Sequence, residues 1–95
     1  MIEFIHQELI VSGKIDYLNA QNYFEQGIQH IQKQLSFPLT VNLAKLESGS
    51  TVALAVLVRW LRQTPQSQGL QFKAVPTKMM KIIQACHLEH DLKMI

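Results

Sequence analysis

The sequence contains only one cysteine, carries little charge and has no long hydrophobic run. A single cysteine cannot form a disulfide within the chain, which fits a reducing compartment such as the cytosol. Charged residues make up 17% of the 95 residues, and the net charge is +2. The nine Lys and Arg residues are scattered, so the charge pattern does not indicate a nucleic-acid partner.

Three further features are missing. The apolar run from Val52 to Val58 has seven residues, whereas a membrane-spanning helix needs about 20. The N-terminus lacks the apolar core of a signal peptide. No glycine-rich phosphate loop is present, so we do not expect the chain to hydrolyse nucleotide. With 47% hydrophobic residues, these absences predict one globular domain over residues 1–95, cytoplasmic and without direct membrane insertion.

The apolar residues alternate in short segments and recur at helical spacing in longer ones, which predicts strands and helices in turn. The expected strands are 2–5, 8–11, 39–43, 70–75 and 92–95, with a hairpin turn at His6-Gln7. The expected helices run from Asp16 or Asn19 to about Leu35, from about 51 to 63, and from 76–77 to about 87. The order β-β-α-β-α-β-α-β predicts an α/β fold: a mixed, mostly parallel sheet with helices packed mainly on one side.

The expected helices differ in their apolar faces. The first has one buried stripe opposite a Gln-rich solvated face (Gln21, Gln29, Gln32), and the stripe comprises Tyr17, Ala20, Phe24, Ile28, Ile31 and Leu35. The second follows a cluster of small polar residues, Ser48 to Thr51, and is apolar on almost every side. In so small a domain the sheet covers one side, which leaves the other as a candidate partner surface.

Helical spacing defines that second surface. Thr51, Ala55, Val58, Arg59 and Arg62 share one face, whereas Ala53, Leu54, Leu57, Trp60 and Leu61 share the face suited to a sheet. The first set is interpreted as a partner contact, together with Ser50. Two simpler interpretations remain open: Ser50 is a helix cap, and the face is merely solvated.

The third helix adds Lys78 and Met79 to this candidate surface. Methionine is a soft contact residue at adaptable binding surfaces, although it is more often part of the core. We expect both residues to lie near the partner.

A catalytic or metal site is not expected. Cys86 and His87 are adjacent on a helix and point in different directions, so they do not form a dyad, and Cys86 is interpreted as core. His87 and His90, with Glu89 and Asp91 nearby, lack further ligands at the spacing of zinc motifs. A small enzyme that uses Cys86 or these His residues is therefore the least favoured hypothesis.

The element order resembles that of the STAS domain, the family that includes bacterial anti-sigma factor antagonists. The resemblance rests on Asn42-Leu43 in the third strand and on Ser50-Thr51-Val52-Ala53 at the following helix start. The family typically has Asp-Leu at the first place, and an acid, a hydroxyl residue and glycines at the second. Thr51 matches the hydroxyl residue, Ser50 replaces the acid, and the glycines are absent.

Within that family, the chain looks most like the small stand-alone subunits of phospholipid ABC transporters. The resemblance implies a non-enzymatic subunit without cofactor or metal, peripheral to the inner membrane of a Gram-negative cell. Its partner would be the ABC transporter ATPase subunit (MlaF-like), in a membrane complex with permease and substrate-binding subunits that maintains outer-membrane lipid asymmetry. The alternative is an anti-sigma factor antagonist switched by phosphorylation at Thr51, which the missing acid disfavours.

Overall fold

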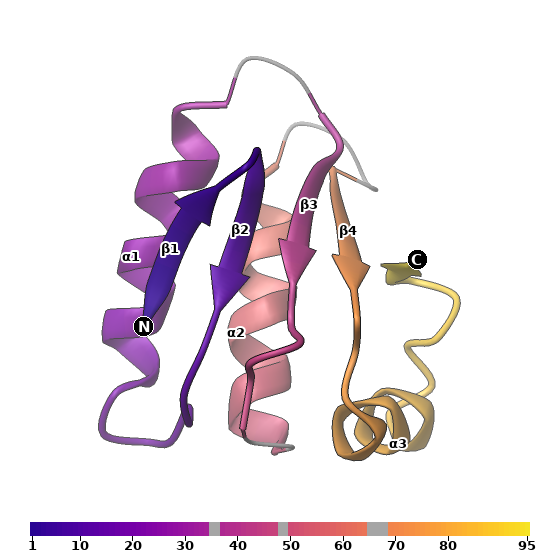
Figure 1. Ribbon diagram of the computed structural model, residues 1–95. Coiled ribbons are helices and arrows are strands. Elements are labelled where there is room, and N and C mark those ends of the chain that lie inside the picture. Colours follow the sequence, from indigo (N-terminus) through magenta and orange to yellow (C-terminus); the bar gives the residue numbers. More distant parts are fainter. Residues whose placement is uncertain (35–36, 48–49, 65–68) are drawn as a thin grey trace.

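A computed structural model of the protein describes residues 1–34, 37–47, 50–64 and 69–95 (Figure 1). The described strands are β1 (Ile2–Ile5), β2 (Glu8–Val11), β3 (Leu39–Asn42), β4 (Leu70–Lys73) and β5 (Lys93–Met94). The described helices are α1 (Ala20–Gln32), α2 (Thr51–Arg62) and α3 (Thr77–Ala85). The predicted order of elements is confirmed. The predicted helix end at Leu35, and the loop residues Ser36, Ser48, Gly49 and 65–68, lie outside the described residues.

The strands form one sheet in the order β1-β2-β3-β4-β5. β1 and β2 pair antiparallel, and each later neighbour pairs parallel. His6 and Gln7 join the first pair with positive φ angles of 53° and 65°. Positive φ at both central residues is the pattern of a type I′ two-residue hairpin turn. The predicted hairpin and the mixed, mostly parallel sheet are therefore confirmed.

The strand order explains where the helices lie. Every crossover between parallel strands steps in the same direction across the sheet, and such crossovers are nearly always right-handed. Successive helices therefore fall on the same face. Figure 1 shows α1 and α2 behind the sheet, with α3 beside the lower end of β4. In the described part of the chain, no helix covers the opposite face.

The two sheet faces differ as the alternation of residues requires. Leu9, Val41 and Phe72 point toward the helices and are at most 1% exposed. The open face carries polar side chains that join three strands: Glu8 accepts from Asn42 Nδ2 at 3.1 Å and pairs with Lys73 Nζ at 2.9 Å. These two bonds lower the pKa of the Glu8 carboxyl, with Lys73 as the largest cause.

α1 and α2 approach each other closely at Gly27. Trp60 of α2 is fully buried, and its Nε1 donates to the Phe24 carbonyl at 3.1 Å. A Cβ added at Gly27 would overlap the Trp60 indole ring. A glycine at this place therefore lets the large ring lie directly on the backbone of α1.

Several sequence-based expectations were wrong in detail. Tyr17 is 88% exposed rather than buried, because it precedes α1, and Tyr23 is buried in the core in its place. α3 has Pro76 at its N-cap position and begins at Thr77. Cys86 is exposed rather than core, because it is the C-cap residue, where α3 ends. β3, β4, β5 and α3 are also slightly shorter than expected.

Candidate partner-binding surface

The first turn of α2 is fixed by Ser50. Its backbone is extended (φ −140°, ψ 159°), its Oγ accepts from Ala53 N at 3.1 Å, and its carbonyl accepts from Leu54 N at 3.0 Å. These are the features of a helix N-cap, so the capping interpretation of Ser50 is confirmed. The cap places Thr51 at the first helical position, where its side chain is exposed.

The exposed side of α2 comprises the residues that the spacing placed there. Thr51, Ala55, Arg59 and Arg62 are exposed, and Val58 is half-buried. We call these five residues the α2 face. On the opposite side, Ala53, Leu54, Leu57 and Trp60 are at most 4% exposed. Leu61, which the spacing placed on the same side, is only half-buried. Apart from Leu61, exposure divides the helix as predicted.

Arg59 is held in place by α1. Its guanidinium carbon lies 3.7 Å from the centroid of the Phe24 ring, which is a cation–π arrangement. Its Nη1 also donates to Gln21 Oε1 at 3.2 Å. A guanidinium has five N–H donors, so others remain for a partner. The sequence did not indicate this contact, because it joins residues that lie far apart in the chain.

Of the two α3 residues predicted to contact a partner, only Lys78 is exposed. Met79 is fully buried, and assigning it to the partner surface was wrong. The reason is rotation about the α3 axis: Met79 and Ile83 are four residues apart and both turn toward the core. Met79 therefore fills the core, as methionines more often do.

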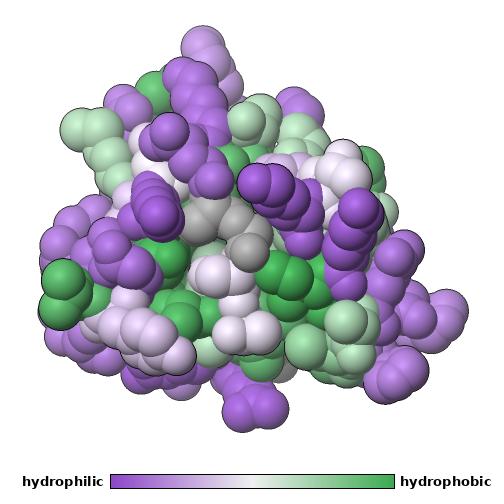
Figure 2. All heavy atoms as spheres, turned by 90° about the horizontal axis from the view of Figure 1, so that it is seen from below, coloured by the Kyte–Doolittle hydropathy of each residue, from purple (hydrophilic) through white to green (hydrophobic). Residues whose placement is uncertain are grey.

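A groove of about 340 Å³ adjoins the start of α2. Ile15, Tyr17 and Val52 supply its apolar lining, and Ser50 lies at the α2 side. Charged residues of both signs surround it: Lys14, Asp16, Glu47 and Lys78. This end of the molecule, viewed from below in Figure 2, shows hydrophobic side chains exposed among hydrophilic ones. The groove brings Ser50 and Lys78 together, and it adds Tyr17 and Val52, which the sequence analysis did not assign to the surface.

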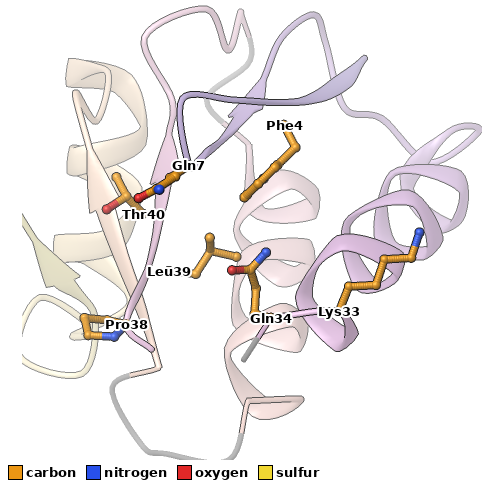
Figure 3. A pocket seen from close by; sticks show the side chains of 7 residues that line it. All are labelled: Phe4, Gln7, Lys33, Gln34, Pro38, Leu39 and Thr40. Atoms are coloured by element: carbon orange, nitrogen blue, oxygen red, sulfur yellow. The ribbon is translucent and has the colours of Figure 1, made fainter. Parts of the chain in front are cut away.

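A second hollow, of about 440 Å³, lies at the other end of the sheet near the β1–β2 turn (Figure 3). The described residues that line it include Phe4, Gln7 and Lys33, and among them only Lys33 is charged. Phe4 also stacks on His30 of α1, with 5.8 Å between the ring centroids. The described lining therefore supplies no pair of acid and base.

The remaining residues considered for catalysis or metal binding do not come together in one site. Cys86 is exposed, and the next residue, His87, has a positive φ of 57°. Within residues 1–34, 37–47, 50–64 and 69–95, no three His, Cys, Asp or Glu residues are placed to hold a metal ion. Of the helices described, none is long and apolar enough to cross a bilayer.

Comparisons with known proteins agree with this architecture. The family model described as "Mlab, STAS domain" matches residues 2–95. A chain of the Acinetobacter MlaFEDB complex in its ATP-bound Vtrans1 conformation is 59% identical, with 100% of both chains covered and a TM-score of 0.92. For the Vtrans2 conformation the identity is 59%, the coverage 100% of this chain and 99% of that chain, and the TM-score 0.93.

A more distant similarity concerns the fold alone. An anti-sigma factor antagonist from Mycobacterium paratuberculosis is 20% identical, with a TM-score of 0.77 over 99% of this chain and 81% of that chain. A search of curated proteins gives no match.

Proposed function

The chain belongs to the family of MlaB-type STAS domains, and from this premise we propose that it is the STAS subunit of an MlaFEDB-type phospholipid ABC transporter. The observation that carries the proposal is the 59% identity to a chain of the Acinetobacter complex over the full length of both chains. The 20% identity to the anti-sigma factor antagonist supports only the shared fold.

The proposed role is binding rather than catalysis. The subunit binds the cytoplasmic ATPase of the transporter and supports its assembly and activity, in a complex with permease and substrate-binding subunits. It is thereby held at the cytoplasmic side of the inner membrane through its partner. The exposed Cys86 and its neighbour His87 take no part in this role.

The α2 face is the proposed contact with the ATPase, together with Ser50 and Lys78. Ala55 and Val58 make its centre small and apolar, so a partner helix can approach closely. Arg59 and Arg62 can form multidentate bonds with carboxylates, and arginine is enriched among the residues that dominate binding energy. Stacking on Phe24 orders Arg59 before binding, which lowers the entropy cost of its contact.

The alternative function, an anti-sigma factor antagonist, requires phosphorylation of Thr51. Thr51 is exposed at a helix N-terminus, where a phosphate is electrostatically favourable. The residue before it is Ser50, which serves as the helix cap instead of supplying an acid. We therefore place phosphorylation of Thr51 second to direct docking.

Affinity purification from native membranes tests the proposed function. A tagged copy of the chain, extracted in mild detergent, is expected to recover an ABC ATPase together with a permease, as identified by mass spectrometry. Recovery of a serine kinase, with phosphate on Thr51, would replace the transporter proposal by the alternative. Recovery of neither would contradict both.

A further inference from the structure

The turn that precedes α1 exposes two large apolar side chains side by side in sequence. Tyr17 is 88% exposed and Leu18 is 96% exposed, which are the largest values among the exposed large hydrophobic residues of the described chain. A single exposed leucine on a protein surface is ordinary. Two adjacent exposed apolar side chains are a candidate contact site when they lie beside an apolar groove, and Tyr17 itself lines this groove.

This turn is held in a defined shape. Asp16 Oδ1 accepts from Leu18 N at 2.9 Å and from Asn19 N at 3.1 Å. Asn19 Oδ1 accepts from Asp16 N at 2.8 Å, and Asn19 Nδ2 donates to the Lys14 carbonyl at 2.8 Å. The two apolar side chains are therefore presented from an ordered backbone, so binding does not have to order the turn first.

The groove adjoins the first residues of α2. Ser50 and Val52 line it, and Thr51 of the α2 face lies between them in the chain. Lys78, already assigned to the proposed contact, lines it as well. A partner that covers Thr51 therefore reaches the edge of the groove.

We infer that Tyr17, Leu18 and the groove beside them form a second part of the contact with the transporter ATPase, and that the groove receives an apolar side chain of that subunit. This inference rests on the proposed function. Val52 and Tyr17 supply apolar surface to the groove, and the charged residues around it, Lys78 and Glu47 among them, suit a polar rim. A buried apolar centre with a polar rim is the usual anatomy of a protein interface.

Binding of the purified ATPase subunit to single-site variants tests the inference. Tyr17→Ser and Leu18→Ser remove exposed apolar surface, so both proteins are expected to fold, as checked by a thermal melt. Each is expected to raise the Kd by about tenfold, the loss typical of a central interface residue. The matched control is Ile95→Ser, which removes an apolar side chain that is 60% exposed at the far edge of the sheet. Its Kd is expected to stay within twofold of that of the unmodified protein.

Two results would overturn the inference. One is that folded Tyr17→Ser and Leu18→Ser bind the ATPase with a Kd within twofold of that of the unmodified protein, while Thr51→Glu still weakens binding. The other is a dimer of the unmodified protein in sedimentation that Leu18→Ser converts to monomer, because the surface would then belong to a second copy. Failure of the proposed function looks different, since the unmodified protein itself would then not bind the ATPase.

Discussion

Gly27 allows α1 and α2 to pack closely, because it has no side chain where the two helices meet. Replacing Gly27 with Ala is expected to destabilise the fold, because the added methyl group would occupy the space of the buried Trp60 ring. Overpacking of this kind typically costs about 1–3 kcal/mol, which exceeds the roughly 1 kcal/mol that Ala gains over Gly in helix propensity. Denaturant unfolding measures the difference.

The matched control for this prediction is Gln29→Ala, at an exposed position of the same helix. Because that side chain is solvated, its replacement should leave the free energy of unfolding unchanged or slightly increased. A Gly27→Ala protein as stable as the unmodified one would mean that the two helices separate without cost.

Arg59 is the second residue whose environment the sequence did not indicate. Replacing it with Lys retains the charge but loses the planar guanidinium that stacks on Phe24. The expected loss of stability is about 0.5–1 kcal/mol, the usual value of an exposed cation–π contact. Arg62→Lys, one turn nearer to the end of α2, is the control and should change stability by less. Equal effects of the two substitutions would contradict a specific role for the stacking on Phe24.

At the scale of elements, the sequence was sufficient to predict the order and type of each helix and strand. The alternation in β3 and the helical spacing in α2 are clear sequence signals, because the apolar residues that make each pattern are buried in the core. Val41 and Leu57, for example, are both at most 1% exposed. Element ends were less accurate. Tyr17 matches the helical period of α1, yet the Asp16 turn starts the helix later and leaves Tyr17 outside it. Local hydrogen bonds decide such boundaries, and spacing alone does not contain them.

The errors at the candidate site have a similar cause, because residue spacing does not show how an element packs against its neighbours. The spacing in α2 fixed which residues share a face, because the sheet and α1 cover the rest of that helix. In α3 the spacing left two faces possible, and only the packing against its neighbours places Met79 inside. The groove beside Tyr17 could not be predicted at all, since it joins three segments that are distant in the chain.

The bonds of Glu8 on the open face of the sheet predict how the stability of the fold depends on pH. Glu8 bonds to Asn42 and Lys73, so its pKa is lowered in the folded protein. A carboxyl of this kind contributes stability above its ordinary pKa of 4.5, and the contribution is lost as pH falls through the lowered value. Glu8→Gln is therefore expected to lose less stability than the unmodified protein between pH 7 and strong acid, as measured by denaturant unfolding at each pH.

Lys73→Gln provides the control for Glu8, because it removes the main cause of the lowered pKa. In that background, Glu8→Gln should change the acid dependence much less. An acid profile of Glu8→Gln identical to that of the unmodified protein would show that the bonds across β2, β3 and β4 do not hold the carboxylate in solution.

In the whole molecule, the core and the proposed partner surface occupy different parts of the domain. The sheet and helices enclose one core, whereas the open sheet face is joined by side-chain bonds among its own strands. The groove and Thr51, the first residue of the α2 face, lie at the end of the domain where the parallel strands finish, and the α2 face extends from there along the helix to Arg62. A partner that docks there covers one continuous surface and leaves the core unchanged.

If the α2 face binds the transporter ATPase, substitutions at Thr51 and Ala55 should weaken that binding, so the decisive measurement is the affinity of Thr51→Glu and Ala55→Arg for the purified ATPase subunit. Both side chains are exposed, so both variants should fold, and a negative charge at the helix N-terminus is itself favourable. Each is expected to weaken binding by about tenfold or more, because charge or bulk intrudes on a close contact. Gln29→Glu and Gln32→Arg, on the solvated face of α1, make the same kinds of change elsewhere and should bind as the unmodified protein does. If folded Thr51→Glu and Ala55→Arg bound the ATPase as tightly as the unmodified protein does, the α2 face would not be the docking surface.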